Sequence, residues 1–231
     1  MTVKGVLFDF SGTLFRIESA ESWLRAALDR TGIPLDEGAL QALARRLAEA
    51  GAQPGGQLPR SVPAHLATAW AQRDARAEQH RAAYTGVARG VPVPDDRLYD
   101  ALYARHMDPA AWVPYPDAAE VLAALRRRGV RIAVVSNIGW DLRPVFRAHG
   151  LDELVDAYVL SYEHGVQKPD PRLFEAACAA LHLPPAEALM VGDDPRADAG
   201  AADVGCAVHL VEHLPVTERP DGLRPVLDLV G

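Results

Sequence analysis

The stretch VKGVLFDFSGT at residues 3–13 decides the fold of this chain. It begins as an almost unbroken apolar run, which is typical of a strand covered on both faces in a parallel sheet. The run reaches Asp9, and the turn-forming residues Ser11, Gly12 and Thr13 follow closely. The stretch therefore predicts a buried strand that carries a carboxylate to one edge of a sheet.

Short apolar runs of the same kind recur in the second half of the chain. They alternate with segments of helical periodicity at 117–128, at 142–149 and after Asp170, which we expect to cap a helix that begins with proline. Strands that alternate with helices predict a parallel sheet with helices on both faces. We therefore expect an α/β fold with a doubly wound, Rossmann-like parallel sheet. The four further runs are residues 130–136, 157–161, 188–193 and 207–211.

The segment 16–110 has a different character, because helical patterns dominate it and no buried-strand run occurs in it. We therefore expect an α-helical insertion at 16–110 that interrupts a sheet domain made of residues 1–15 and 111–231. The helical patterns lie at 20–30, 37–50, 64–84 and 96–106 in the insertion, and a short helix near the end of the chain is expected to pack Leu223, Val226, Leu227 and Leu229.

The composition argues against several classes of protein. The chain has 231 residues with 24 basic and 31 acidic side chains, a net charge of −7 and no basic run longer than three residues, so nucleic-acid binding is not expected. No stretch approaches the roughly 18 consecutive apolar residues of a membrane span, and the start of the sequence has no leader-like pattern. Cys178 and Cys206 lack metal-site spacing, which favours reduced, buried thiols in a cytoplasmic protein. A monomer and a homodimer are both compatible with these features.

Polar side chains follow several of the expected strands at the point where each strand ends. In a doubly wound sheet, the carboxyl ends of the strands form the edge at which ligands bind. Taken singly, each of these residues also fits a turn or a helix cap. Their occurrence in order at successive strand ends favours a single polar site. They are Asp9, Ser11 and Thr13 after the first run, Ser136 and Asn137 after the second, Lys168 in a loop beyond the third, and Asp193 and Asp194 after the fourth.

This ordered set of residues resembles the motifs of the haloacid dehalogenase superfamily of hydrolases. The resemblance covers almost the whole chain and is specific for the superfamily, but it says little about the substrate. The insertion is similar to the helical cap of the subfamily that contains phosphoglycolate-type phosphatases and 2-haloacid dehalogenases. The four matching segments are 9–13, 135–137, Lys168 and Pro169 with Pro171 and Phe174, and 191–194 with Asp198.

The resemblance implies a nucleophilic role for Asp9. A carboxylate that attacks phosphorus forms an aspartyl phosphate and so divides one difficult displacement into two easier ones. Lys168, one of only two lysines among the 24 basic residues, would neutralise the nucleophile and the transferring group. A compact ammonium fits between a carboxylate and a phosphoryl group where a guanidinium fork does not. Ser136, Asn137 and Thr13 are the expected phosphate-binding residues.

A Mg²⁺ ion is the cofactor that the resemblance implies, since Mg²⁺ prefers oxygen ligands and would separate the negative charges. The expected ligands are the carboxylates of Asp9 and Asp193 and the backbone carbonyl of Ser11. Asp194 is a candidate fourth ligand or an acceptor further out. Asp198, about one helical turn later, could orient the lysine or the metal waters, or could simply be a charged residue in the first turn of a helix.

Ser11 departs from the family pattern, because phosphatases of this superfamily usually carry a second aspartate two residues after the nucleophile. That aspartate protonates the leaving oxygen and then activates water, and general acid–base catalysis of this kind contributes roughly 10²–10⁴-fold. A serine hydroxyl has no useful acidity near neutral pH, although its backbone carbonyl is kept. Three alternatives stay open: a substrate with a good leaving group, an acid from elsewhere such as a cap histidine, and a much weakened enzyme.

Other activities found on this fold agree less well with the sequence. Phosphonoacetaldehyde hydrolases hold their substrate as an imine on a cap lysine, and residues 16–110 contain no lysine. The 2-haloacid dehalogenases need no metal, carry an aromatic residue at the position of Ser11 and lack the paired acids at 193–194, which would repel Asp9 without a cation. A degraded protein that binds a phosphorylated ligand or a partner is supported by Ser11 and opposed by the retained Asp9 and Lys168. We therefore expect a Mg²⁺-dependent hydrolase of a small phosphorylated metabolite.

Substrate choice should depend on the cap and on the loop after Thr13. Each candidate residue there also fits ordinary helix packing or a solvated surface. His80 has an additional interest as a replacement proton donor, because the ordinary pKa of histidine lies near neutral pH. The candidates are Arg16, Glu18, Trp23, Trp70, His80 and Tyr84, together with Trp140 after the second run.

Overall fold

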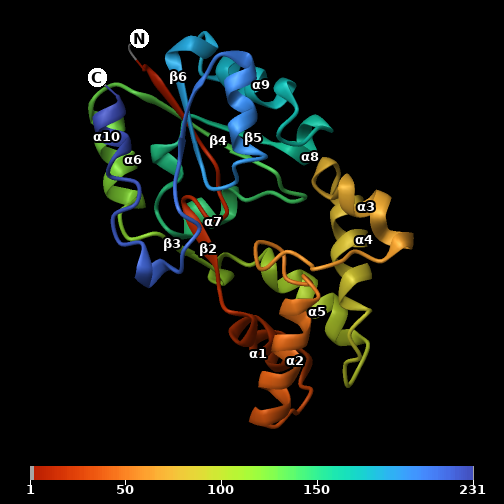
Figure 1. Ribbon diagram of the computed structural model, residues 1–231. Helices are drawn as coiled ribbons and strands as arrows, with labels where there is room; N and C mark the ends of the chain where they lie inside the picture. Colours follow the sequence, from red (N-terminus) through yellow and green to blue (C-terminus); the bar gives the residue numbers. More distant parts are fainter. Residues whose placement is uncertain (1–2, 231) are drawn as a thin grey trace.

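A five-stranded parallel sheet forms the centre of the larger of two lobes, which we call the sheet lobe (Figure 1). The computed structural model describes residues 3–230, so Met1, Thr2 and Gly231, which belong to the expected sheet domain, lie outside the described residues. The strand order is β5-β4-β1-β6-β7, and the first strand of the chain therefore lies in the middle. The α/β class and the parallel sheet predicted from the sequence are confirmed. The strands are β1 (Gly5–Phe8), β4 (Arg131–Ser136), β5 (Ala157–Leu160), β6 (Ala188–Gly192) and β7 (Ala207–Leu210).

Helices cover both faces of this sheet (Figure 1). Because side chains alternate along a strand, Val6 and Phe8 of β1 belong to one apolar cluster and Leu7 belongs to the cluster on the other face. The expected cap of α9 is present, since the Asp170 carboxylate accepts a hydrogen bond of 3.0 Å from the Arg172 backbone N–H. The first face carries α6 (Ala118–Arg127), α7 (Arg143–Ala148) and α10 (Val226–Leu229); the second carries α9 (Pro171–Ala180) and the 3₁₀ segment η6 (Asp198–Val204), and α8 (Ser161–His164) follows β5.

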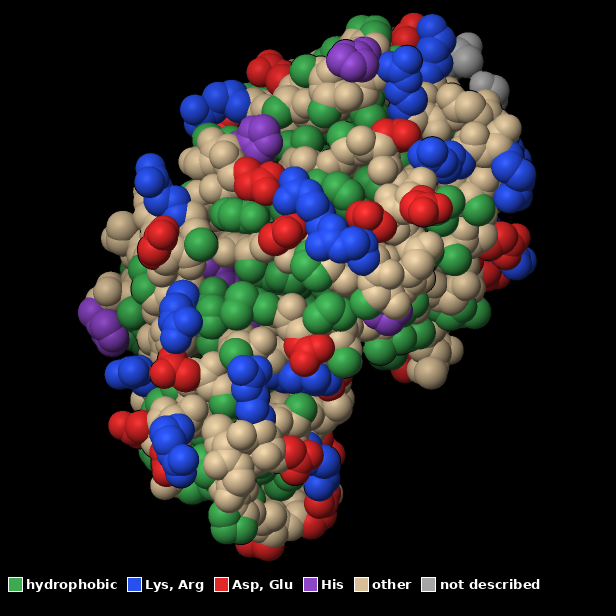
Figure 2. Space-filling view, turned by 180° about the vertical axis from the view of Figure 1, so that it is seen from behind, with side chains coloured by type: hydrophobic (Ala, Val, Ile, Leu, Met, Phe, Trp, Pro, Cys, Tyr) green, Lys and Arg blue, Asp and Glu red, His purple; other side chains and the backbone are tan. Residues whose placement is uncertain are grey.

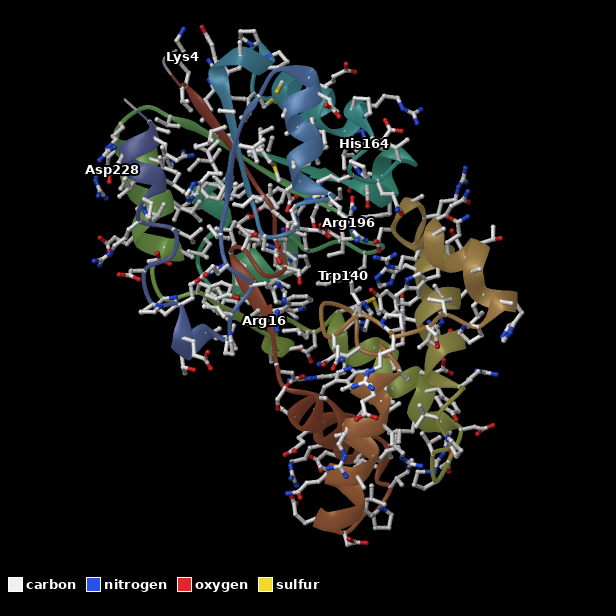
Figure 3. The ribbon with its side chains drawn as sticks, viewed as in Figure 1. Lys4, Arg16, Trp140, His164, Arg196 and Asp228 are labelled. Carbon is white, nitrogen blue, oxygen red and sulfur yellow. The ribbon has the colours of Figure 1, made fainter. Side chains whose placement is uncertain are left out.

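The residues from 20 to 106 form the second lobe, which we call the helical lobe. In Figure 1 it lies below the sheet, and Figure 3 shows Lys4 and Asp228 at the opposite end of the molecule. The helical lobe has an apolar core of its own, in which Trp23, Leu47 and Leu98 are buried. Its helices are α1 (Ala20–Thr31), α2 (Glu37–Glu49), α3 (Ala67–Ala71), α4 (Ala77–Ala88) and α5 (Arg97–His106).

The segment 64–84, for which the sequence predicted one helix, is broken. α3 is flanked by two 3₁₀ segments, η1 (Ala64–Leu66) and η2 (Arg73–Ala75), and α4 begins only at Ala77. The cause is tertiary: the Asp74 backbone N–H donates to Gln167 Oε1 at 3.3 Å, and the Asp74 carbonyl accepts from Ser161 Oγ at 2.5 Å. These backbone groups are bonded to the sheet lobe instead of continuing a helix, so the prediction of a single helix was wrong.

A two-stranded antiparallel ribbon joins the lobes. β2 (Phe15–Ile17) pairs with β3 (Trp112–Pro114), with Phe15 opposite Pro114 (Figure 1). The sequence did not predict β2, because a strand of three residues is too short to show a period. The ribbon brings the chain into and out of the helical lobe at one place.

The end of the chain packs less completely than predicted. Leu223 and Val226 are buried and Leu227 is partly buried, as expected, but Leu229 is 45% exposed. A helix of four residues, such as α10, can present only one face to the sheet lobe, and Leu229 lies on the other face.

The outer surface mixes charges of both signs. Figure 2 shows Lys and Arg side chains close to Asp and Glu side chains over both lobes. Cys178 and Cys206 are free and buried, as predicted. No helix among residues 3–230 is long and apolar enough to cross a membrane.

We predict that Phe10→Ala lowers the free energy of unfolding by about 3–5 kcal/mol. Phe10 is fully buried, and its ring centroid lies 4.5 Å from that of Trp112 and 5.2 Å from that of Phe15, so truncation leaves a cavity between β1 and the ribbon. Urea-induced unfolding measures the change. Leu229→Ala, at an exposed position, is the control and should shift the value by less than about 0.5 kcal/mol. Equal effects of the two substitutions would contradict the packing described.

Candidate active site

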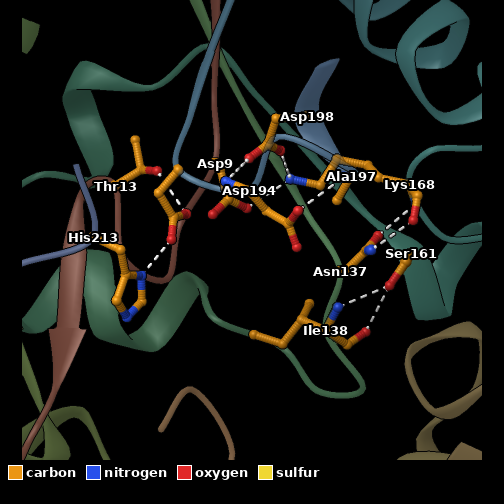
Figure 4. A network of polar contacts seen from close by, with 11 residues as sticks. Asp9, Thr13, Asn137, Ile138, Ser161, Lys168, Asp194, Ala197, Asp198 and His213 are labelled. Carbon is orange, nitrogen blue, oxygen red and sulfur yellow. Dashed lines mark hydrogen bonds and ion pairs between the residues drawn. The ribbon is translucent and has the colours of Figure 1, made fainter. Parts of the chain in front are cut away.

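Polar side chains gather at the carboxyl edge of the five-stranded sheet, and Figure 4 shows Asp9, Ser161 and His213 among them. Asp9 follows β1, Ser136 ends β4 and Asp193 follows β6. Ser161 follows β5, and His213 lies in the loop beyond β7. Because β1 lies between β4 and β6, Asp9 is at the centre of this group. The residues that the sequence placed at separate strand ends therefore meet at one edge.

The Lys168 ammonium lies between two carboxylates. Its Nζ is 2.7 Å from Asp9 Oδ1 and 2.6 Å from Asp198 Oδ1, and all three residues are buried. Burial by itself would lower the pKa of Lys168, but the charges of Asp198 and Asp9 hold that pKa above its ordinary value. Burial raises the pKa of Asp9 well above its ordinary value, although the adjacent ammonium opposes the rise. The lysine therefore stays charged and holds the Asp9 carboxylate in place.

Asn137 fixes the loop that carries Lys168. Its Oδ1 accepts a hydrogen bond of 2.6 Å from the Lys168 backbone N–H, and its Nδ2 donates to the Lys168 carbonyl at 2.9 Å. The peptide bond between Lys168 and Pro169 in this loop is cis. Both polar atoms of the Asn137 side chain are thus engaged by the backbone of the lysine.

Three carboxylates form a group that could hold a metal ion. Ligand oxygens of Asp9, Asp193 and Asp198 lie within 4.8 Å of one another. Carboxylate oxygens are the ligands that Mg²⁺ prefers, so this donor set fits that ion. Asp198 takes part in the group, whereas the Asp194 carboxylate accepts a hydrogen bond of 2.7 Å from the Arg196 backbone N–H and so closes the turn after β6.

Asp193 has further partners that the sequence did not reveal. Thr13 Oγ1 donates to Asp193 Oδ1 at 3.3 Å, and the Nδ1 atom of His213 contacts Oδ2. Burial by itself would raise the pKa of Asp193, but the hydrogen bond and the charge of His213 bring that pKa below its ordinary value. The other ring nitrogen of His213 contacts the Arg16 guanidinium. No motif contains His213, and only the path of the chain after β7 brings it to the site.

The loop after β1 is tightly confined. Gly12 has a φ of 87°, in the left-handed region that favours glycine, and a Cβ there would lie 2.4 Å from Asp193 Oδ2. The buried Arg219 guanidinium donates to the Gly12 carbonyl at 2.7 Å and also to the Thr13 carbonyl. Ser11 is half-buried, and a Cβ placed on Gly55 would lie 3.1 Å from its hydroxyl. The Ser11 side chain therefore faces the helical lobe.

A cavity of about 680 Å³ lies between the two lobes at this edge of the sheet. Its volume is in the range of sites for small molecules. Asp9, Ser11, Ser136 and Lys168 line it from the sheet lobe. Figure 3 shows Arg16 and Trp140, which also line it, near the junction of the lobes. The helical lobe contributes Gln53, Trp70, Arg73, Asp74, His80 and Tyr84, among others.

The substrate-selecting candidates divide into two groups. Arg16, Trp70, His80, Tyr84 and Trp140 line the cavity, and neither Glu18 nor Trp23 does. Glu18 pairs with Arg105 at 2.6 Å, and the indole N–H of Trp23 donates to the Leu102 carbonyl inside the helical lobe. Arg73 and Asp74 were missed because they lie where the sequence predicted the middle of one helix, and a helical pattern gives no sign of a break made by contacts with the other lobe.

His80 is a neutral side chain in this structure. It is buried, and burial lowers its pKa to about 3, with the charge of Arg73 acting in the same direction. Its Nδ1 lies 2.9 Å from the hydroxyl of Tyr103, and its Nε2 lies 3.8 Å from Asp74 Oδ1. An imidazole that is unprotonated at neutral pH does not supply the acidic proton that Ser11 lacks.

Comparison with known proteins assigns the chain to a family. The family model described as haloacid dehalogenase-like hydrolase matches residues 3–204, so the chain belongs to this family of hydrolases. The protein named phosphatase MT3486 of Mycobacterium tuberculosis (strain CDC 1551 / Oshkosh) is 28% identical over 100% of this chain and 96% of its own length.

Other relatives match over shorter segments. Phosphoserine phosphatase of Thermus thermophilus is 43% identical over 38% of this chain and 36% of its own length. Haloacid dehalogenase-like hydrolase domain-containing protein 3 of Homo sapiens is 35% identical over 56% of this chain and 50% of its own length. The chain thus spans only about a third to a half of the length of these two relatives. A crystal structure of a dehalogenase with an intermediate complex has a TM-score of 0.69 at 22% identity, covers 99% of this chain and 97% of its own, and shows that the fold is shared.

We predict that the burial of His80 makes the protein less stable as the pH falls. The pKa of histidine is about 6.5 in an unfolded chain and about 3 at His80 in the folded protein, so the unfolded chain takes up the proton first. Below pH 6.5, each further drop of one pH unit therefore removes about 1.4 kcal/mol of unfolding free energy, until the pKa of His80 in the folded protein is reached.

Urea unfolding at pH 7.0 and pH 5.5 tests this expectation. Between these values, His80→Gln should lose about 1 kcal/mol less stability than the wild type. His164→Gln removes an exposed histidine and should behave as the wild type. The same loss in the wild type and in His80→Gln would show that His80 does not cause the pH dependence.

Proposed function

We propose that this protein is a Mg²⁺-dependent phosphatase that acts on a small phosphorylated metabolite through an aspartyl phosphate on Asp9. The observation that carries this proposal is the buried Lys168 ammonium, 2.7 Å from Asp9, at the wall of a cavity large enough for a metabolite. A carboxylate can approach an anionic phosphoryl group only if fixed positive charge lies beside it. Membership of the hydrolase family and the phosphatase name of a relative matched along the whole chain support the same activity.

The side chains divide the work of phosphoryl transfer. Asp9 attacks phosphorus as the bond to the leaving oxygen breaks, and water then hydrolyses the acyl phosphate. Lys168 neutralises the nucleophile and a phosphoryl oxygen, while Asp198 keeps its ammonium charged and oriented. Ser136, whose side chain lies at the buried end of β4 and lines the cavity, is the hydroxyl donor that we assign to a phosphoryl oxygen. Asn137 and Thr13 contact Lys168 and Asp193, respectively, and their role in binding phosphate stays a prediction.

Asp9, Asp193 and Asp198 are the residues that would hold Mg²⁺, with the backbone carbonyl of Ser11 as a further ligand. When bound, the ion supplies the positive charge that offsets repulsion among the carboxylates and the phosphoryl group. Asp194 supports the group, since its backbone N–H donates to Asp198 Oδ2 at 2.9 Å. The close grouping of these carboxylates is also why we favour a phosphatase over a 2-haloacid dehalogenase, whose reaction needs no metal.

The hydrolysis of p-nitrophenyl phosphate tests the proposed activity. We predict turnover that depends on Mg²⁺ and falls by about 10³-fold or more in Asp9→Asn, because the amide is not a nucleophile. Asp193→Asn should raise the Mg²⁺ concentration needed for half-maximal activity. Glu163→Gln, at an exposed position outside the cavity, is the control.

Two outcomes would count against this proposal. Turnover that persists in Asp9→Asn would remove the nucleophile from the mechanism. Phosphate binding without any turnover would favour the alternative that Ser11 supports, a protein that binds a phosphorylated ligand without hydrolysing it.

We predict that Ser11→Asp accelerates the hydrolysis of alkyl phosphates by about 10-fold or more. An alkoxide leaves slowly unless it is protonated, and the added carboxyl supplies that proton from the side of the loop that faces the helical lobe. The rate for p-nitrophenyl phosphate should change much less, because its leaving group needs little protonation. Ser11→Asn is the matched control of similar size without an acid. If alkyl phosphates react no faster in Ser11→Asp than in Ser11→Asn, the missing acid does not limit the reaction.

A further inference from the structure

Arg73 is a cation that the helical lobe holds at the wall of the cavity. It belongs to η2, it lines the cavity, and its side chain is 22% exposed. The other cations that line the cavity are engaged: Lys168 lies between Asp9 and Asp198, and Arg16 contacts His213. Arg73 is therefore a cation that the helical lobe contributes to this cavity, and its ion pair with Asp74 is long, at 3.5 Å.

The surroundings of Arg73 hold the guanidinium in a fixed position. Its Cζ atom lies 4.7 Å from the centroid of the Trp70 ring, and its Nη1 donates to the Trp70 carbonyl at 3.0 Å. Burial by itself would lower the pKa of Arg73, but the charge of Asp74 and the neighbouring Tyr84 hydroxyl hold that pKa above its ordinary value. The side chain is thus charged and ordered before any ligand enters.

The hydrogen-bonding capacity of Arg73 is not used up by the protein. Nε lies 3.5 Å from Asp74 Oδ2, which is too long for a good hydrogen bond, and this buried nitrogen has no partner among residues 3–230. Arg73 donates to the Trp70 carbonyl and lies beside the Tyr84 hydroxyl and the Asp74 carboxylate, so these neighbours engage only part of its donor set. A guanidinium offers five N–H donors in a planar fork that matches carboxylate and phosphate groups. The fork therefore has room for an anionic ligand.

The position of Arg73 relative to the phosphoryl site is set by contacts between the lobes. Gln167, next to Lys168 in sequence, accepts a hydrogen bond from the Asp74 backbone and donates to the Ala71 carbonyl at 3.0 Å. Ser161, at the carboxyl end of β5, donates to the Asp74 carbonyl. These bonds tie η2 to the same loop and sheet edge that carry the proposed phosphoryl-binding residues.

We propose that Arg73 binds a second anionic group, a carboxylate or a second phosphate, on the leaving-group part of the substrate. This inference rests on the proposed phosphatase function, because it assigns the first anionic group to the side of the cavity that holds Lys168. It makes Arg73 a residue that determines specificity: doubly anionic substrates gain a charge-assisted hydrogen bond that neutral alkyl phosphates cannot make.

Matched substrates test the role of Arg73. Phosphoglycolate and 2-hydroxyethyl phosphate have the same chain length and differ in a carboxylate against a neutral alcohol. We expect the wild type to prefer phosphoglycolate, and Arg73→Gln to lower the ratio of the two kcat/KM values by about 10- to 100-fold. Arg73→Lys keeps the charge without the fork and should retain part of the preference. Arg76→Gln, which removes an exposed arginine three residues away, should retain all of it.

A bisphosphate of ethane-1,2-diol distinguishes the two sources of the second anion. If Arg73→Gln lowers kcat/KM more for phosphoglycolate than for the bisphosphate, the second anionic group is a carboxylate. If it lowers kcat/KM more for the bisphosphate, that group is a phosphate. Thermal melting of each variant shows whether the fold is intact. If the ratios of the kcat/KM values for these substrates are the same in folded Arg73→Gln and in the wild type, the proposal is overturned.

A binding measurement separates this proposal from the proposed activity. Titration calorimetry with Asp9→Asn and Mg²⁺ compares the Kd of phosphoglycolate with that of 2-hydroxyethyl phosphate, with Arg73 present or replaced by Gln, and requires no turnover. If the wild type hydrolyses neither these compounds nor p-nitrophenyl phosphate but Arg73→Gln weakens the binding of phosphoglycolate alone in this titration, the phosphatase activity is wrong and the anion subsite stands. If both compounds bind equally in both backgrounds, the subsite is wrong whatever the activity.

Discussion

The arrangement of the site depends on one buried ammonium group held between two carboxylates. A charge removed from water is costly unless it is paired and hydrogen-bonded, and Lys168 meets this condition through Asp9 and Asp198. The three residues come from separate parts of the chain: Asp9 from the end of β1, Lys168 from the loop before α9 and Asp198 from the start of η6. The ion pairs of Lys168 with Asp9 and Asp198 therefore connect these elements, and they keep the proposed nucleophile beside fixed positive charge.

The two lobes contribute different chemistry to the cavity between them. The carboxyl edge of the sheet supplies the acids and the lysine that phosphoryl transfer requires. The helical lobe supplies aromatic rings, a neutral histidine and Arg73, which suit recognition of the remainder of a substrate. Ser11 lies where the two meet, so the residue that departs from the family pattern faces the helical lobe.

Much of the fold and part of the site could be predicted, because local patterns carry that information. The buried strands appear as apolar runs, and a parallel sheet necessarily gathers their carboxyl ends, so Asp9, Ser136 and Asp193 could be placed at one edge. The lysine in the third segment was recognised from its motif, but its pairing with Asp198 required coordinates. The break at Arg73 and the approach of His213 had no local signal. The break depends on Ser161 and Gln167, which lie 87 and 93 positions from Asp74, and His213 contacts an aspartate that follows another strand.

The sequence by itself determined the class of fold and the order of the chemical residues, and it predicted a helical insertion at 16–110. The hydrophobic periodicity of a segment and the residue types at its ends are properties of neighbouring residues, so both can be interpreted without knowledge of distant contacts. Only the tertiary structure decided which carboxylate pairs with the lysine, which acids gather into one group, and which side chains of the helical lobe reach the cavity. Those choices depend on distances of a few ångströms between segments far apart in the chain, and electrostatic and hydrogen-bond energies change steeply over such distances.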